Sequence, residues 1–278
     1  MNNNIIIIRI KGGLGNQLFQ YNLGEYLSSK LGYIVKYDVK TGYLNDRFNR
    51  NVCFHSIFNN DETLIYRGIF SNIYILRILK KITTLFNTSF LKYLYLDENI
   101  NISTESLFEY LKKSSNNFIL EGYWQDINLI YDKFIEKLNF NQKETFIDYN
   151  SNDLIIHYRS DNFSDSFDFE YYNISINKMI SNYPNINNIF IYSDSKKVIE
   201  LLNYLKNIYT ISIQADYNDY DPYLLLNTIS RSKYFIASNG TFSFWAMLLG
   251  NNRFIIAPPN LKTNNFPLNS NIYFYSNE

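Results

Sequence analysis

One pattern recurs along this chain: a short apolar run ends in polar residues, and a helical periodicity follows. Such runs occupy residues 5–10, 154–157, 189–192 and 234–237. Short, continuously apolar runs are typical of strands buried on both faces, which occur in parallel sheets covered by helices. The pattern predicts an α/β fold in which each strand leads into a helix.

A polar stretch at residues 139–152 divides the pattern into two parts. Domain boundaries fall in segments of this kind, and 278 residues are enough for two ordinary domains. We therefore predict an N-terminal α/β domain over residues 1–150 and a C-terminal Rossmann-like domain over residues 151–278.

Composition argues against several classes of protein. Lys plus Arg equals Asp plus Glu, 26 each, so no net positive charge favours nucleic acid. The single cysteine, Cys53, cannot form an internal disulfide, and one cysteine with two histidines is too few for a structural zinc site. No apolar run approaches the roughly 18 residues of a membrane span, and none resembles a signal-peptide core. We expect a cytoplasmic protein with no nucleic-acid partner.

The first apolar run is followed by a glycine-rich turn at residues 11–17, a helix and a second strand at residues 34–37. Gly13 and Gly15 let backbone N–H groups approach a ligand, while Asn16 and Gln17 offer amide donors at the start of the helix. A tight turn without any ligand would use the same glycines.

The same turn resembles part of a dinucleotide fingerprint. Gly13 and Gly15 supply the first two glycines, and Asp38 ends the second strand near the expected acidic position. Leu18 takes the place of the third glycine, which leaves a nicotinamide oxidoreductase as a lesser alternative.

Residues 70–96 form a basic amphipathic segment. At 100° per residue, one face carries Ile75, Leu79, Ile82 and Phe86, and the opposite face carries Arg77, Lys80, Lys81 and Thr84. The pattern is typical of a core-facing helix with a solvated side, and it also suits peripheral contact with a membrane.

An apolar strand at residues 118–121 runs into an aromatic and amide cluster that contains Trp124 and Gln125. Aromatic rings stack on the C–H faces of sugars and amides pair with hydroxyls, so the cluster suits a sugar-binding groove. Trp124 as an ordinary core residue fits the same pattern.

Polar clusters follow three apolar runs of the second half of the chain. His157, Arg159 and Asp161 follow the first, and residues 193–195 and 238–243 follow the other two. Because the carboxyl ends of parallel strands lie at one edge of a sheet, these clusters converge on a nucleotide or nucleotide-sugar site. Arg159 and the strand-to-helix turn at residues 238–243 would bind a diphosphate. The structural alternative pairs Arg159 with Asp161 and makes His157 a core histidine.

Several ordered segments resemble the motifs of bacterial α-1,2-fucosyltransferases of glycosyltransferase family 11. Residues 11–21 match K-G-G-L-G-N-Q-x-F-Q-Y, and residues 157–163 align without a gap to H-x-R-R-G-D-Y. Residues 192–194 resemble the third motif, and residues 239–245 are similar to N-S-T-F-S-x-W. A further G-Y-F-Q segment has its counterpart in residues 122–125.

Two positions depart from the second motif. Ser160 stands where the family has its second arginine, and Asn162 stands at the motif aspartate. Asp161 offers a carboxylate from the neighbouring position. These departures keep a second hypothesis open, a catalytically inactive nucleotide- or glycan-binding protein of the same fold.

The resemblance implies a GT-B-type fold, in which two Rossmann-like domains face a central cleft. It implies inverting transfer of L-fucose from GDP-fucose to the 2-hydroxyl of a terminal β-galactoside, in O-antigen or surface polysaccharide synthesis. The acceptor would be bound by the first domain and can be lipid-linked, the donor would be bound by the second, and neither a cofactor nor a metal ion would be required.

The resemblance also implies the site residues. The catalytic set is Arg159, Asp161 and His157. The donor-binding set is Gly13, Asn16, Arg159, Ser193, Asp194, Ser238, Asn239, Thr241 and Phe242. The acceptor-binding set is Gln17, Trp124 and Gln125.

A general base would deprotonate the acceptor hydroxyl, with Asp161 as first candidate and Asp165 or Asp168 as alternatives. Asp219 and Asp221 resemble the metal-binding D-x-D of other glycosyltransferases. We instead predict Asp221 as a helix N-cap, because Pro222 follows it at the first helical position.

Overall fold

The computed structural model describes residues 4–44, 46, 50–53, 67–68, 72–85, 93–99, 102–138, 150–159, 169–217, 220–250, 253–261 and 271–275. Contacts divide the chain into two units, Met1–Asn139 and Phe140–Glu278. The division falls inside the polar segment at residues 139–152. Each unit is described by itself.

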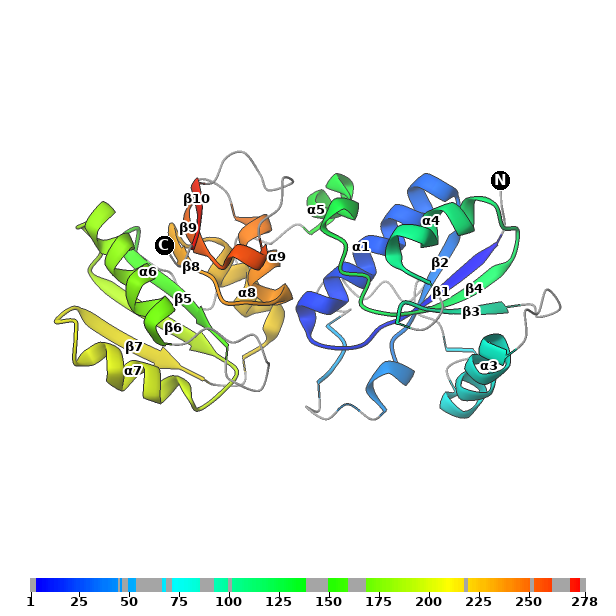
Figure 1. Cartoon of the computed structure of the whole chain (residues 1–278), viewed down its shortest axis with the longest axis horizontal. Helices are drawn as coiled ribbons and strands as arrows, with labels where there is room; N and C mark the ends of the chain where they lie inside the picture. The colour runs from blue at the N-terminus through cyan, green and yellow to red at the C-terminus, as the bar shows by residue number, and fades with distance from the viewer. Residues whose placement is uncertain are drawn as a thin grey trace. The chain divides into compact units, whose positions relative to one another are not determined.

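The first unit is built on a four-stranded sheet in the order β2-β1-β4-β3, in which every pairing is parallel (Figure 1). Its strands are β1 (Ile5–Arg9), β2 (Ile34–Asp38), β3 (Tyr93–Asp97) and β4 (Asn117–Glu121). The central strands β1 and β4 are apolar on both faces, as a sheet covered by helices requires.

Helices of the first unit cover this sheet and connect its strands. They are α1 (Leu14–Leu31), α3 (Ile73–Leu85), α4 (Thr104–Lys112) and α5 (Asp132–Lys137), with short 3-10 turns η1 (Thr41–Tyr43) and η4 (Ile127–Leu129). Ser103 caps α4 by accepting a hydrogen bond from the Ser106 backbone. Helix α1 ends at Gly32, whose φ of 70° closes the helix in the left-handed conformation.

Three buried amides distinguish α1 from an ordinary amphipathic helix. Gln17, Gln20 and Asn22 are each at most 2% exposed. Gln20 accepts from the Lys11 N–H and donates to the Gly122 carbonyl, while Asn22 bonds the backbone of Leu129 and Tyr131. These amides supply hydrogen-bond partners to backbone groups that lie outside the regular pairing of the sheet. Buried polar groups need such partners to be stable.

The second unit contains a six-stranded parallel sheet in the order β10-β9-β8-β5-β6-β7 (Figure 1). Its strands are β5 (Asp153–Tyr158), β6 (Asn188–Ser193), β7 (Ser212–Asp216), β8 (Tyr234–Ile236), β9 (Phe254–Ala257) and β10 (Asn271–Phe274). Numbered within the unit, this is the Rossmann order 3-2-1-4-5-6. The strand order reverses between β5 and β8, which is where such sheets bind ligands at their carboxyl ends.

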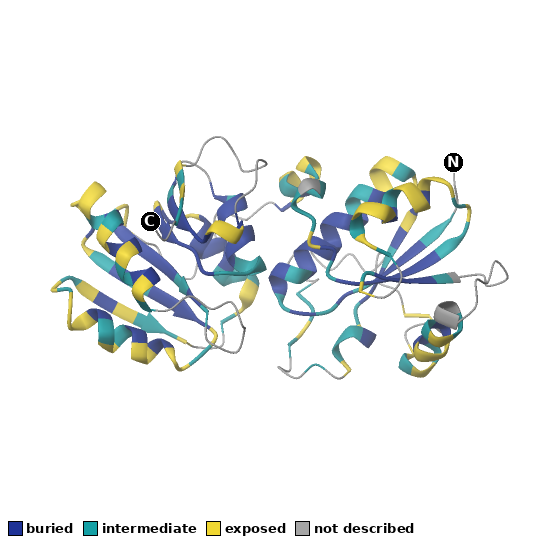
Figure 2. Ribbon diagram, viewed as in Figure 1, coloured by how far each residue is buried: buried dark blue, intermediate teal, exposed yellow. Residues whose placement is uncertain are grey.

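The helices of the second unit are α6 (Phe169–Asn182), α7 (Val198–Lys206), α8 (Pro222–Ser230) and α9 (Thr241–Leu249), with a 3-10 turn η5 (Pro259–Leu261). Helices α6 and α7 pack on the sheet face that carries Leu154, Ile156 and Ile236. Because strand crossovers are right-handed, the reversal of strand order puts α8 and α9 on the opposite face (Figure 1). Buried residues are concentrated on the central strands and the inner helix faces of both units (Figure 2).

Asp221 is the N-cap of α8 and Pro222 is its first residue, as predicted. The Asp221 carboxylate accepts the Leu224 N–H at 2.9 Å. The capping interpretation is therefore confirmed for Asp221, and Asp219 lies outside the described residues.

A buried arginine, Arg253, joins the ends of α8 and α9. It is 2% exposed and donates to the carbonyls of Ile229, Ser232 and Ala246 at 2.6 to 2.9 Å. Burial lowers the pKa of Arg253 to about 9. Carbonyls at helix C-termini carry partial negative charge, which compensates a buried cation. No local pattern in the sequence marks this residue.

A GT-B-type fold consists of two Rossmann-like α/β domains. This prediction is confirmed for each unit taken separately. The structure adds β3, β9 and β10, which the apolar pattern does not predict. Helix α9 starts at Thr241, with Gly240 as its N-cap. Among the described residues, no helix is long and apolar enough to cross a membrane.

Candidate functional site

The carboxyl ends of β8, β5 and β6 are neighbours, so the three predicted polar clusters do meet at one edge of the sheet. Parallel pairing sets Ile156 beside Ile236 and Tyr158 beside Ser193. His157 and Ser193 therefore stand at the ends of adjacent strands, and Ser238 follows β8 on the other side. This is the point at which the strand order reverses.

His157 is held there by two serines that follow β8. Its Nδ1 lies 2.7 Å from Ser243 Oγ and 2.9 Å from Ser238 Oγ, and the two hydroxyls are 3.1 Å apart. Both serines are at most 1% exposed. The Ser238 backbone N–H also donates to Ser243 Oγ at 3.1 Å. The imidazole is thereby fixed from its Nδ1 side.

This geometry selects one tautomer of His157. If Nδ1 accepts the Ser243 hydroxyl proton, the Ser238 hydroxyl donates to Ser243 Oγ. Both buried hydroxyl protons then have an acceptor. If Nδ1 carried the proton, one hydroxyl proton would lack an acceptor among the described residues, at a substantial cost. We infer that His157 is protonated on Nε2.

The imidazole is also neutral. Burial, together with the smaller effect of the nearby Arg159 guanidinium, lowers the pKa of His157 to about 3. A neutral ring with its proton on Nε2 offers one hydrogen-bond donor and no free lone pair on that nitrogen. His157 is therefore suited to donate a hydrogen bond to an anion and unsuited to act as a general base.

Arg159 lies one residue beyond β5 and is fixed by the turn after β8. Its Nη1 donates to the Asn239 carbonyl at 3.0 Å. Gly240 permits this approach, because a Cβ at that position would lie 2.2 Å from Arg159 Nη1. The φ of Gly240 is 136°, a conformation that residues with a side chain rarely adopt. The turn is thus shaped around the guanidinium.

Phe242 and Asn239 complete the surroundings of this cluster. The Phe242 ring lies 4.9 Å from the His157 ring, and Asn239 Oδ1 accepts from Asn260 Nδ2 at 2.6 Å. Helix α9 begins at Thr241, directly after the turn, with no acidic residue in its first turn. Its N-terminus adds partial positive charge to the fixed positive charge of Arg159.

The predicted residues of the β6 end lie on the neighbouring strand without a described contact to His157 or Arg159. Ser193 Oγ accepts the Ser195 N–H at 3.1 Å, which shapes the turn, and Asp194 is exposed. Asp161, Asp165 and Asp168 lie outside the described residues, as do Ser160 and Asn162. The identity of the general base therefore stays a prediction.

In the first unit, the predicted turn after β1 brings Asn16 and Gln125 together. Asn16 Oδ1 accepts from Gln125 Nε2 at 2.8 Å. Gly12 has a φ of 83°, and Gly13 is the N-cap of α1 without a side-chain cap. The two amides lie at the carboxyl ends of β1 and β4, the edge at which parallel sheets bind ligands.

Gln17 and Trp124 point into the protein in this structure. Gln17 is fully buried and bonds the backbone of Gly12, Asn51 and Cys53. Trp124 is 1% exposed, with a φ of 53° that is uncommon for an aromatic residue. Glu98 holds this strand end by accepting the Tyr123 and Trp124 N–H groups. Acceptor binding by Gln17 and Trp124 stays a prediction, and the structure gives both a packing role.

Asp38 is not presented to a ligand as the dinucleotide alternative requires. It is 2% exposed, and its carboxylate accepts from the Lys40 and Thr41 N–H groups at 3.0 Å. The acid therefore holds the turn after β2, which argues against a ribose-binding role.

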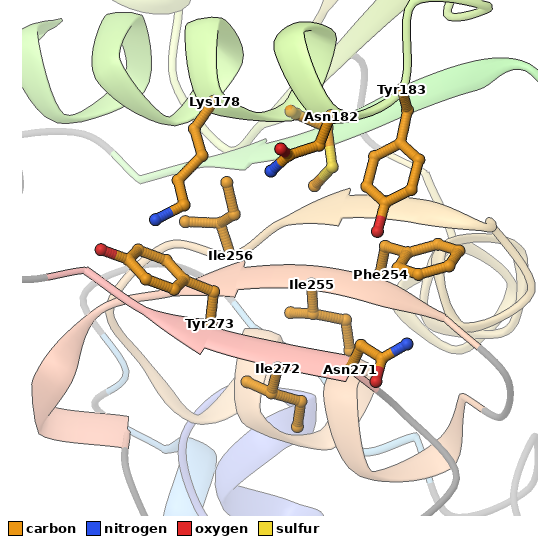
Figure 3. Close-up of a pocket in the computed structure, with 10 residues that line it drawn as sticks. Lys178, Asn182, Tyr183, Phe254, Ile255, Ile256, Asn271, Ile272 and Tyr273 are labelled. Carbon is orange, nitrogen blue, oxygen red and sulfur yellow. The ribbon is translucent and has the colours of Figure 1, made fainter.

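A cavity of about 400 Å³ lies elsewhere in the second unit, between α6 and the neighbouring strands β9 and β10 (Figure 3). Phe254 and Asn271, the first residues of these strands, line it together with Asn182 and Tyr183 at the end of α6. The cavity runs along residues 254–256 and 271–273 of the two strands, and none of its lining residues belongs to the His157 cluster. Among the described residues, no group of three His, Cys, Asp or Glu side chains could hold a metal ion.

Two residues of the cluster are not among the site residues predicted from the sequence. Ser243 and Gly240 both belong to the segment 239–245, yet only the structure shows that one contacts His157 and the other makes room for Arg159. The signal in the sequence was the small-residue turn itself, which does not specify a partner.

No protein-family model matches this sequence, and no curated protein matches it. Among solved structures, the chain is similar to a glycosyl transferase family 9 protein from Veillonella parvula, with 9% identity, a TM-score of 0.48, and coverage of 99% of this chain and 87% of that chain. It is similar to fucosyltransferase NodZ from Bradyrhizobium, with 15% identity, a TM-score of 0.49, and coverage of 90% and 95%.

A third similar structure is POFUT1 in complex with GDP, with 13% identity, a TM-score of 0.49, and coverage of 98% of both chains. All three TM-scores lie below 0.5. This likeness therefore decides neither the activity nor the substrates of the chain.

Proposed function

We propose that this chain is an inverting α-1,2-fucosyltransferase, which moves L-fucose from GDP-fucose to the 2-hydroxyl of a terminal β-galactoside. The observation that carries the proposal is that two of the motifs lie side by side at the carboxyl ends of adjacent strands. His157 and Arg159 of the second motif contact Ser238, Asn239 and Ser243 around the fourth. The resemblance to glycosyltransferase family 11 rests on the same residues.

The geometry suits a leaving diphosphate. As the bond between fucose C1 and the β-phosphate oxygen breaks, its electron pair stays with GDP and negative charge grows on the phosphate. Fixed donors aimed at that charge lower the barrier more than mobile water does. Arg159, the Nε2–H of His157 and the N-terminus of α9 supply such donors at the same edge of the sheet.

The remaining steps of the proposed reaction involve the acceptor. Its 2-hydroxyl oxygen forms the new bond to C1 from the opposite side, which inverts the anomeric centre, and its proton passes to a base. Asp161 is the first candidate for that base and Asp165 or Asp168 the alternatives. Since the positive charge at the phosphate is built from side chain and backbone, the proposal includes no metal ion or other cofactor.

The proposed acceptor is a β-galactoside of O-antigen or surface polysaccharide synthesis, bound by the first unit. Asn16 and Gln125 are hydrogen-bonded to each other at the carboxyl ends of β1 and β4. Hydroxyls of the acceptor sugar would replace this bond by hydrogen bonds to the two amides. Gly13 and Asn16 are further proposed to contact the donor.

The test is release of GDP from GDP-fucose in buffer containing EDTA, with and without a panel of β-galactosides. Acceptor-dependent release, with an α-1,2 linkage in the isolated product, is expected. Release that requires a divalent cation would contradict the metal-free mechanism, and a different linkage would contradict the acceptor assignment.

A binding measurement separates the second hypothesis from the first. GDP at 100 times its dissociation constant stabilises a protein that binds it by roughly 2.7 kcal/mol, which raises the melting temperature. Stabilisation by GDP without turnover on any acceptor would favour a catalytically inactive nucleotide-binding protein. If neither GDP nor GDP-fucose stabilised the protein, the assignment of GDP-fucose as the donor would be contradicted.

A further inference from the structure

Helix α3 carries its two most exposed large hydrophobic residues on the side turned away from the sheet. Tyr74 is 68% exposed and Ile78 is 58% exposed, the two highest values for such residues in the part of the chain that the structure describes. They are four residues apart and lie one above the other on the helix. The outer side of α3 appears as an exposed surface in Figure 2.

The inner side of the same helix is already used. Leu76 and Leu79 are buried in a cluster with Ile7, Tyr95 and Ile119 of the sheet. Tyr74 and Ile78 therefore cannot be explained as core-facing residues. The predicted amphipathic segment is confirmed as a helix over Ile73–Leu85, while residues 93–96 of the segment belong to β3. The exposed side of the helix is not purely polar.

A basic row runs beside the apolar one. Arg77 and Lys81 are exposed and four residues apart, so the outer face of α3 consists of Tyr74, Arg77, Ile78 and Lys81. Lys80 points elsewhere and pairs with Asp97 at 2.6 Å. The helix contains no Asp or Glu. Its outer face therefore combines exposed apolar surface with two exposed basic side chains, on a helix that has no acidic residue.

We propose that the outer face of α3 binds the surface of an anionic lipid bilayer. Tyrosine and isoleucine can enter the boundary between headgroups and acyl chains, while the long stems of Arg77 and Lys81 let their charges stay at the phosphate level. Anionic headgroups complement the basic row. Lys81 argues against a protein partner, because lysine is depleted at protein interfaces, whereas Tyr74 and Arg77 are of types enriched there.

The test is co-sedimentation of the full chain with vesicles of phosphatidylcholine alone or mixed with phosphatidylglycerol, at low and high salt. We expect binding to the mixed vesicles that weakens at high salt. Tyr74→Ser with Ile78→Ser should weaken it by about tenfold or more. Arg77→Ser with Lys81→Ser should weaken it roughly 10- to 30-fold and remove the preference for anionic vesicles.

The matched control is Ile208→Ser with Tyr217→Ser, which removes the same residue types from exposed positions of the second unit, 46% and 41% exposed. It should leave vesicle binding unchanged. Equal loss in this control, equal binding to both vesicle types, or no binding at low salt would overturn the proposal.

One further outcome would replace the membrane by another partner. If the chain self-associates and Tyr74→Ser with Ile78→Ser abolishes that association without any vesicle binding, the face is an interface between copies, and the proposal is wrong. The assay needs neither donor nor acceptor, so its result does not depend on fucosyl transfer.

Discussion

Ser243 Oγ lies 2.7 Å from Nδ1 of His157, although the two residues are 86 positions apart in the sequence. The contact ties the first turn of α9 to the end of β5 and directs the imidazole proton to Nε2. Two elements that a phosphate-binding site needs, a helix N-terminus and a fixed donor, are thereby joined by one hydrogen bond.

Replacing both Ser238 and Ser243 by alanine should let the His157 ring populate both tautomers, because either hydroxyl alone can still donate to Nδ1. Loss of the hydrogen bond to Nδ1 costs about 1 kcal/mol, so we expect GDP affinity to fall about fivefold. The chain has only two histidines, so 15N shifts of the His157 ring can be assigned with a His55→Gln variant.

Two variants distinguish this positioning role from simple destabilisation. Ser243→Ala alone leaves the Ser238 hydroxyl as a donor to Nδ1 and should keep the Nε2–H tautomer. Ser230→Ala removes another buried serine, whose hydroxyl donates to Asn227, and should lower stability without changing the His157 signal. An unchanged tautomer in the double variant would contradict the assignment.

Replacing Arg159 by alanine should leave the fold intact and reduce GDP release by at least about 100-fold, the usual scale for loss of one preorganised donor. Arg159→Lys keeps the charge but loses the planar fork, so we expect intermediate activity. Initial rates and melting curves measured on both variants check this. A well-folded Arg159→Ala variant with full activity would remove Arg159 from the site.

Replacing Gly240 by alanine should displace Arg159, because the new Cβ would lie 2.2 Å from its Nη1. We expect a loss of stability of about 1–3 kcal/mol from the strained backbone and a fall in GDP affinity of about tenfold or more. Calorimetry of GDP binding measures the second effect.

Gly32→Ala is the matched control for Gly240→Ala. Gly32 also has a positive φ, 70°, but no atom lies within 4 Å of a Cβ built there. It should lose stability and keep GDP affinity. Similar affinities for the two variants would show that Gly240 does not shape the site.

The pH dependence of stability should report on His157. Its pKa of about 3 in the folded protein lies below the ordinary value of 6.5. Between these values the unfolded chain binds a proton that the folded chain does not, so the free energy of unfolding falls as pH drops below about 6.5. From pH 7 to pH 5 the loss should be roughly 1–2 kcal/mol.

Urea unfolding of the parent and of His157→Gln across this pH range isolates that contribution. The variant should show a shallower decline by the same amount. Parallel curves for the two proteins would mean that His157 titrates normally in the folded state.

Replacing Arg253 by methionine should destabilise the second unit by about 3–5 kcal/mol, since three buried helix-end carbonyls would lose their donor. Arg231→Met, at an exposed position of the same region, should change stability by less than about 0.5 kcal/mol. Denaturant melts of the two variants give the comparison, and equal losses would contradict a special role for Arg253.

The sequence by itself determined the alternation of strands and helices, the cap at Asp221 and the polar clusters after three strands. These features depend on local periodicity, on capping chemistry and on the burial that apolar runs demand. It also indicated the turn at residues 238–243, because small polar residues between a strand and a helix are typical of anion sites.

Only the tertiary structure decided which of these residues touch. The strand order β8-β5-β6 places Ser238 and Ser243 on His157, and the backbone of Gly240 makes room for Arg159. The same long-range packing assigns Gln17 to buried backbone groups and Arg253 to two helix ends. Such contacts join segments far apart in the chain, and local composition does not encode the partner of a side chain.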